Sequence, residues 1–267
     1  MAVHEPLASF TPVKAILFDV FGTVVDWEGG LTSQLQEIAR KKGVGDPQVA
    51  SRLDQVNWLA FAQEWRSGFW AVARAFPRNQ DIDDFDIDDV HRDCLRPLIP
   101  KYGLEGVWTE AEINEITRFW HYLKGWPDSS SALHKLRRNY MIGTCANGTL
   151  RLLIDMSRHA DLPWNTIFTS DVLHIFKPSP QFYLRAAGLL RLQPSEILMV
   201  AAHDYDLAAA NEVGFRTCYV RRRTEDGGGR HVRVGAGGIE WLVDSFDEIV
   251  EGLDRIRKSS PHDLLTL

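Results

Sequence analysis

The sequence is poor in cysteine and has no long apolar run. Its 3 cysteines, Cys94, Cys145 and Cys218, are odd in number, far apart and form no CxxC pair. They give no disulfide framework, which favours a reducing compartment, and we expect a cytoplasmic protein. No apolar stretch reaches the roughly 18 residues of a membrane-spanning helix. Residues 1–12 lack the pattern of a signal peptide, so we expect no membrane partner.

A surplus of basic residues is also missing. The chain of 267 residues has 30 Lys and Arg against 36 Asp and Glu, a formal net charge of -6. Because nucleic acids bind to basic faces, we expect no nucleic acid as a partner. Hydrophobic residues make up 45% and charged residues 25%, as in an average globular protein. The length suits one core with a large insertion, or just under two domains.

Short apolar runs that end near polar residues indicate buried parallel strands. These runs are residues 13–19, 140–145, 166–169, 197–202 and 216–220. Helical patterns lie between them, at residues 150–160, 179–190 and 207–213. This alternation predicts an α/β fold with a Rossmann-like parallel sheet covered by helices.

The segment after the first strand has a different character. Residues 29–126 contain no convincing strand but several amphipathic helical patterns, including 56–76 and 113–123. We predict a helical cap domain at 29–126, inserted into an α/β core domain made of residues 1–28 and 127–267.

Two irregular segments have ordinary explanations. Residues 81–89 are rich in aspartate, which suits a solvated loop followed by the acidic first turn of a helix better than a metal site. The glycine-rich segment 226–238 is interpreted as a mobile surface loop.

Residues able to do chemistry follow several of the expected strands. In an open parallel sheet, ligands bind at the carboxyl ends of the strands, where the strand order reverses. Asp19 follows the first strand and could form an ester or an acyl phosphate if a fixed cation, for which Lys177 is the candidate, keeps it ionised. Asp204 or Asp206 could then bind a metal or direct water onto the intermediate.

Four motifs occur in a characteristic order: Phe18 to Asp26, Ala146-Asn147-Gly148, Lys177-Pro178, and Val200 to Ala210. Together they resemble the motifs of the haloacid dehalogenase superfamily, and they are most similar to those of its type II L-2-haloacid dehalogenases. The resemblance spans residue 14 to about residue 222. The predicted helical insertion falls where that family carries its cap.

Phe21 separates two branches of the superfamily. Its phosphatases usually carry a second aspartate two residues after the nucleophile, which protonates an alcohol leaving group, whereas this chain has Phe21. A halide leaves as a stable anion and needs no proton. The main hypothesis is therefore a hydrolase without metal or cofactor. The alternative is a magnesium-dependent phosphatase or phosphonatase with Asp19 and Asp204 or Asp206 as ligands. A binding module without activity is a third reading, against which the intact Asp19, Lys177 and Asp206 argue.

The resemblance implies a two-step reaction on a 2-haloalkanoic acid of (S) configuration. Asp19 would displace the halide and form an ester, and water would then attack the carboxyl carbon of Asp19 to release a 2-hydroxy acid. Lys177 would orient and stabilise Asp19, and Asp206 matches the carboxylate associated with the hydrolytic step. Family members often form homodimers, so a homodimer is an expectation that rests on the resemblance alone.

The same resemblance assigns the substrate contacts. Backbone N–H groups of Val20 and Phe21 and the region of Asn147 would bind the substrate carboxylate. The family places a cap arginine over the leaving halide, and Arg66 is the candidate, with a surface position on an amphipathic helix as its alternative. Asn147 would share the halide site. Three aromatic residues would add apolar or edge contacts, namely Trp65, Tyr205 and Trp27.

Two positions depart from the family pattern. Ala146 stands where a serine is usual, so carboxylate binding would depend more on backbone donors. His203 stands where an asparagine is common. With a pKa near 6.5, a neutral imidazole could accept a proton from water, or it could only hydrogen-bond a neighbouring carboxylate.

Overall fold

The computed structural model describes residues 13–75 and 86–259, and within them six parallel strands form one sheet of order β3-β2-β1-β4-β5-β6. The strands are β1 (Ala15–Phe18), β2 (Met141–Ala146), β3 (Thr166–Thr169), β4 (Ile197–Ala201), β5 (Arg216–Val220) and β6 (Trp241–Val243). Five of them match the predicted runs. The last one, β6, has only three residues, too few to give a readable pattern in the sequence.

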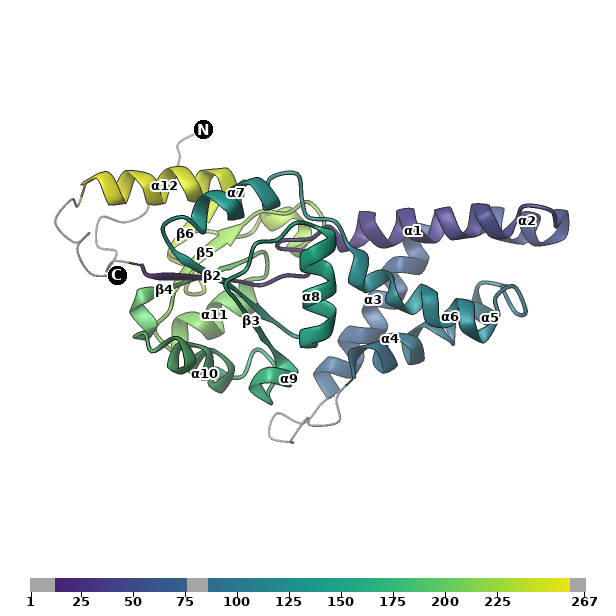
Figure 1. Cartoon of the computed structure of the whole chain (residues 1–267), viewed down its shortest axis with the longest axis horizontal. Helices are drawn as coiled ribbons and strands as arrows, with labels where there is room; N and C mark the ends of the chain where they lie inside the picture. The colour runs from purple at the N-terminus through teal and green to yellow at the C-terminus, as the bar shows by residue number, and fades with distance from the viewer. Residues whose placement is uncertain (1–12, 76–85, 260–267) are drawn as a thin grey trace.

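Alternating side chains of the strands bury into two cores, one on each face of the sheet. Ile16 and Phe18 of β1 belong to the core that includes α7 (Ser129–Leu136), α8 (Leu150–His159) and α12 (Phe246–Ser259). Ala15 and Leu17 belong to the core formed with α9 (Ser170–Leu173), α10 (Pro180–Leu190) and α11 (Asp204–Glu212). Figure 1 shows α7 and α12 above the sheet and α10 and α11 below it. The predicted α/β fold with helices on both faces is confirmed.

The remaining helices lie beside the sheet rather than on its faces (Figure 1). They are α1 (Trp27–Lys42), α2 (Pro47–Asp54), α3 (Trp58–Ala75), α4 (Ile87–Leu95), α5 (Leu98–Lys101) and α6 (Glu110–Thr117), followed by the 3-10 helix η1 (Arg118–Tyr122). The two ends of this segment meet where Val25 pairs with Gly125 in an antiparallel bridge. A separate cap domain at 29–126 remains a prediction.

The order of the strands fixes where a ligand site can form. From β1 the chain moves outward through β2 and β3, then returns to the other side of β1 to continue through β4, β5 and β6. The carboxyl ends of β1 and β4 therefore flank the reversal point of the sheet. Asp19 follows β1 directly, and His203 lies two residues after β4.

The predictions for the two irregular segments, 81–89 and 226–238, agree with the structure to different extents. Residues 81–85 lie outside the described part of the chain, but Asp86 caps α4, and Asp88 and Asp89 occupy its first turn as expected. The interpretation of 226–238 as a surface loop is incomplete. Residues Asp226–Gly229 form the 3-10 helix η3, and the side chain of Val232 packs into the core on the α10 and α11 face. None of the described helices is long and apolar enough to cross a membrane.

Candidate active site

Asp19 is held in one orientation by groups from three parts of the chain. Its backbone N–H donates to the carbonyl of Val200, which places it against the end of β4. Oδ1 accepts a hydrogen bond from Lys177 Nζ at 2.8 Å, and Oδ2 accepts one from Thr23 Oγ1 at 2.6 Å. Nδ1 of His203 lies 3.1 Å from the same Oδ2. The side chain of Asp19 is only 8% exposed, so these contacts replace the hydration shell of its carboxylate.

Lys177 bridges two buried carboxylates. Its Nζ lies 2.8 Å from Oδ1 of Asp19 and 2.5 Å from Oδ2 of Asp206, and the hydroxyl of Tyr183 donates to the other oxygen of Asp206. Asn147 fixes the backbone at this point, because its Oδ1 accepts from Lys177 N at 2.7 Å and its Nδ2 donates to Lys177 O at 3.0 Å. The side chain of Asn147 thus positions Lys177, a role that its expected place in the halide site did not include.

The charges of this cluster follow from its contacts. Burial alone would raise the pKa of Asp19, but the charge of Lys177 and the hydrogen bond from His203 hold that pKa well below its usual range. Burial would lower the pKa of Lys177, and the two neighbouring carboxylates raise it instead. Asp19 is therefore ionised and Lys177 is charged, which is the state that a nucleophilic carboxylate requires.

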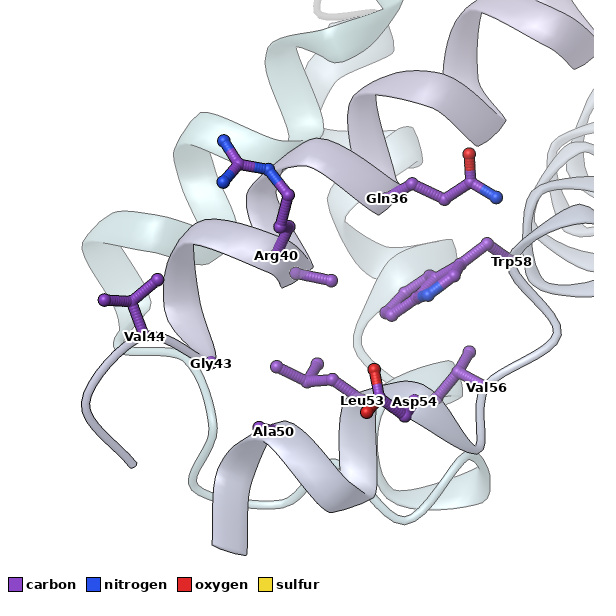
Figure 2. Close-up of a pocket in the computed structure, with 10 residues that line it drawn as sticks. Gln36, Arg40, Gly43, Val44, Ala50, Leu53, Asp54, Val56 and Trp58 are labelled. Atoms are coloured by element: carbon purple, nitrogen blue, oxygen red, sulfur yellow. The ribbon is translucent and has the colours of Figure 1, made fainter. Parts of the chain in front are cut away.

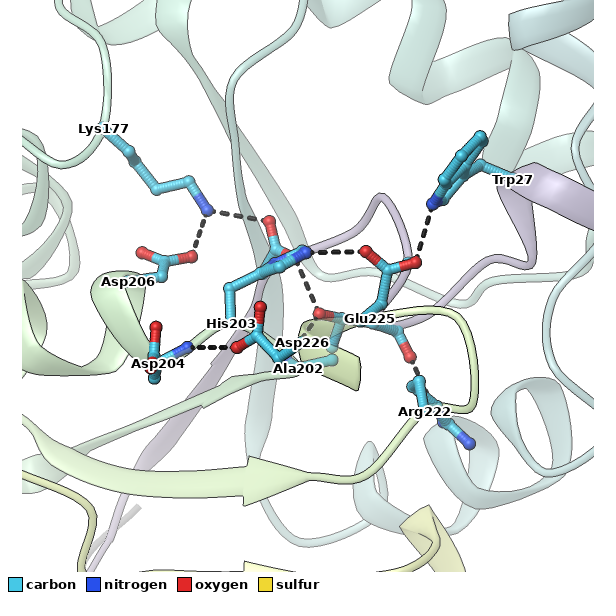
Figure 3. Close-up of polar contacts among 12 residues, drawn as sticks. Trp27, Lys177, Ala202, His203, Asp204, Asp206, Arg222, Glu225 and Asp226 are labelled. Atoms are coloured by element: carbon cyan, nitrogen blue, oxygen red, sulfur yellow. Dashed lines mark hydrogen bonds and ion pairs between the residues drawn. The ribbon is translucent and has the colours of Figure 1, made fainter. Parts of the chain in front are cut away.

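Glu225 is a site residue that sequence reasoning missed. It lies in the loop after β5, and its Oε2 is 2.9 Å from Nε2 of His203 (Figure 3). Its other oxygen, Oε1, accepts hydrogen bonds from Trp27 Nε1 and Thr224 Oγ1, both at 2.7 Å. The imidazole of His203 thus lies between Asp19 and Glu225. A signal did exist, because Glu225 follows a strand at the same edge of the sheet.

A glycine makes room for this arrangement. Gly22 has a φ of +88°, and a Cβ built on it would lie 2.4 Å from the carboxyl carbon of Glu225. Any other residue would be strained in that conformation and would push the carboxylate away. Arg222 also ties the two loops together, since its Nε donates to the carbonyl of Thr23 at 2.9 Å.

Arg66 reaches the site from α3 and is only 5% exposed. The centres of five aromatic rings lie 5.0 to 5.6 Å from its Cζ, namely those of Trp70, Phe21, Trp27, Phe69 and Trp120. The described part of the chain gives its guanidinium no hydrogen-bond or ion-pair partner. A buried cation surrounded by ring faces retains N–H groups that can donate hydrogen bonds to an anion. The predicted surface alternative for Arg66 is wrong.

A small cavity of about 10 Å³ separates Arg66 from Asp19. Its lining residues are Asp19, Phe21, Arg66, Phe69, Trp70, Asn147, Lys177, His203 and Tyr205. Most of the predicted site residues are therefore brought together. Trp65 does not line the cavity, because it is fully buried and its Nε1 donates to the carbonyl of His91. The tryptophan that lines the cavity is Trp70. The side chain of Val20 is also buried, in the core that contains α7 and α8.

Asp204 lies apart from this cavity. Its backbone N–H donates to Asp226, and its half-exposed carboxylate is 3.3 Å from Nε2 of His231. Within the described ranges, these three residues are the group whose ligand atoms lie close enough to share a cation. Asp19 and Asp206 instead share Lys177. Of the two acids that the sequence offered, Asp206 contacts Lys177 beside Asp19 and Asp204 does not, so Asp206 remains the candidate for the hydrolytic step.

A larger cavity of about 440 Å³ lies at the far end of the helical segment, between α1, α2 and the start of α3. Its lining includes the apolar side chains of Leu53, Val56 and Trp58 together with Arg40 and Asp54 (Figure 2). It contains no pair of acid and base comparable to that around Asp19. The buried charged cluster of Asp19, Lys177 and His203 lines the smaller cavity.

The fold is a parallel α/β sheet, and the site places a buried, ionised carboxylate at the reversal point of that sheet. A family model described as haloacid dehalogenase-like hydrolase matches residues 13–214. The chain belongs to this hydrolase family.

Relatives and solved structures that are similar to this chain are named as 2-haloacid dehalogenases. The (S)-2-haloacid dehalogenase 4A of Burkholderia cepacia is 22% identical over 216 residues, covering 79% of this chain and 84% of the relative. Among solved structures, the L-2-haloacid dehalogenase PA0810 is 31% identical, with a TM-score of 0.76 over 91% of this chain and 99% of that one. The defluorinating L-2-haloacid dehalogenase Rha0230 is 30% identical, with a TM-score of 0.80 over 95% and 100%.

Proposed function

We propose that the protein is a hydrolytic dehalogenase that converts (S)-2-haloalkanoic acids into 2-hydroxy acids and halide. The observation that carries this proposal is the pairing, across one small cavity, of an ionised Asp19 with a buried Arg66 that has no hydrogen-bond or ion-pair partner among the described residues. A halide that leaves the substrate carbon would have the guanidinium of Arg66 on one side and the carboxylate of Asp19 on the other. The similar proteins support the same substrate class.

In the first step, an oxygen of Asp19 attacks the carbon that bears the halogen. The carbon–halogen bond breaks, and the halide takes the electron pair and moves toward Arg66. Phe21 and Trp70 keep water away from the carboxylate, which makes it a better nucleophile. Backbone N–H groups of Val20 and Phe21 bind the substrate carboxylate.

In the second step, water attacks the carboxyl carbon of the Asp19 ester. The bond between that carbon and the substrate oxygen breaks, and the 2-hydroxy acid leaves. Lys177 stabilises the negative charge that develops on Asp19, because its Nζ already contacts Oδ1. Asp206 keeps Lys177 in place, and His203 accepts the proton of the water. The reaction uses no metal, and a homodimer remains part of the proposal.

Halide release in the presence of a chelator tests this function. Purified protein with EDTA should release chloride from (S)-2-chloropropionate and chloroacetate, because no step needs a cation. The cavity is small and is lined by Phe21, Phe69 and Trp70, so chloroacetate should be used better than longer acids. Absence of halide release, together with magnesium-dependent cleavage of a phosphate ester, would falsify the proposal.

Substitution of Arg66 tests the halide site separately. Bromide should raise the melting temperature of the wild type, since an anion that binds only the folded state stabilises it. Arg66→Met should lose this stabilisation and lower kcat/KM by about 10²-fold or more. Arg66→Lys should retain part of both effects. Sodium sulfate at equal ionic strength is the control, and an equal bromide effect in wild type and Arg66→Met would count against Arg66.

A further inference from the structure

We propose that Glu225 is a positioning residue that fixes the proton on Nε2 of His203, so that Nδ1 accepts the proton of the water that cleaves the Asp19 ester. This inference rests on the proposed function. It adds a residue from the loop after β5 to the site.

The contacts of Glu225 leave it only the role of a hydrogen-bond acceptor. Burial would raise its pKa, but the hydrogen bond with His203 lowers it, so the carboxylate is ionised. Trp27 and Thr224 both donate to Oε1, and Oε2 lies 2.9 Å from Nε2 of His203. Because an ionised carboxylate has no proton to give, Nε2 must carry one. A neutral His203 therefore has its free lone pair on Nδ1, the atom that faces Asp19.

The two carboxylates explain how the charge of His203 changes during the cycle. Burial would lower the pKa of His203, but hydrogen bonds to Asp19 and Glu225 raise it to about 10 in the free enzyme. Two other rings lie near the imidazole. The distance between ring centres is 5.6 Å for Tyr205 of α11 and 6.4 Å for Trp70 of α3. Ester formation removes the negative charge of Asp19. The imidazolium then faces one carboxylate instead of two and releases its Nδ1 proton to solvent.

The second step restores the starting state. Water gives its oxygen to the carboxyl carbon of Asp19, one proton to Nδ1 of His203 and the other to the oxygen of the departing 2-hydroxy acid. The enzyme returns to an ionised Asp19 and a charged His203. Over the whole cycle, one haloacid and one water become one hydroxy acid, one halide and one proton, so atoms and charges balance.

Glu225→Gln tests the proposal, because the amide has nearly the same shape but can donate a hydrogen bond to Nε2. A donor there favours the tautomer with the proton on Nδ1, which cannot accept a proton from water. We expect a first-turnover burst of one halide per enzyme at nearly the wild-type rate. Steady-state turnover should fall about 10²-fold or more. The intact protein should then carry the mass of the ester on Asp19. Trp27→Phe, which removes one donor to Oε1, should give a smaller effect of the same kind.

His203→Asn provides the matched background. If Glu225 acts through His203, then Glu225→Gln should have no further effect on ester hydrolysis in the His203→Asn protein. Equal slowing of the burst and of steady-state turnover, wild-type turnover in Glu225→Gln, or an undiminished effect in the His203→Asn background would each overturn the proposal. A wild type that releases no halide would instead refute the proposed function.

Discussion

Asp19→Asn should release no halide in a single turnover and should lower kcat by at least about 10⁴-fold, because the amide cannot form the ester. The fold should persist. The asparagine is nearly the same size. Thr23 and Lys177 donate to different oxygens of Asp19, and one of the two can still donate to the oxygen that the amide keeps. The measurement is halide release by stoichiometric enzyme, with circular dichroism to verify the fold.

Asp204→Asn is the matched control, since it removes a carboxylate one residue after His203 that points away from the cavity. We expect its kcat to stay close to the wild-type value. Halide release by Asp19→Asn would show that Asp19 is not the nucleophile. A large loss of kcat in Asp204→Asn would show that the surface group of Asp204, Asp226 and His231 takes part in the reaction.

Lys177→Met should have the largest effect on stability. It leaves Asp19 and Asp206 as buried carboxylates without their shared cation, and removal of one partner from a buried ion pair costs about 3–5 kcal/mol. Halide release should fall by about 10³-fold or more, because the pKa of Asp19 would rise and its charge would be lost. Lys135→Met, which removes a half-exposed pair with Asp247, should change the melting temperature little.

The stability loss in Lys177→Met should depend on pH in a defined direction. In the wild type, the pKa of Asp19 lies well below its ordinary value of 3.8, so its contribution is present at neutral pH and is lost in acid. Without the lysine, the folded protein would bind protons more readily than the unfolded chain. The difference in free energy of unfolding between the two proteins should therefore shrink as the pH falls from 7 to about 4. A difference that is constant with pH would contradict the assigned charges.

The strands and the motif residues were readable from the sequence because they depend on local patterns. Apolar runs place β1 and β4, and the residues that follow them, Asp19 and His203, must meet at the reversal point of the sheet. Lys177 was predictable for a related reason, since an ionised carboxylate in a buried site needs a cation.

Contacts between distant segments were harder to predict. Both Trp65 and Trp70 belong to α3, and only packing against α4 and η1 decides that Trp65 turns inward while Trp70 lines the cavity. Glu225 was hidden by the glycine-rich segment after it, which reads as an ordinary loop. Its position depends on Gly22, more than 200 residues earlier in the chain, which leaves space for its carboxylate.

The ester on Asp19 is the central claim, and a single turnover in heavy-oxygen water tests it most directly. With enzyme in excess over a 2-haloacid, the water oxygen should enter the carboxylate of Asp19, and the 2-hydroxy acid should carry the original oxygen of the aspartate. Mass spectrometry of the peptide that contains Asp19 and of the product gives both values. Heavy oxygen in the product of the first turnover, with none on Asp19, would mean that water attacks the substrate directly and would contradict the account.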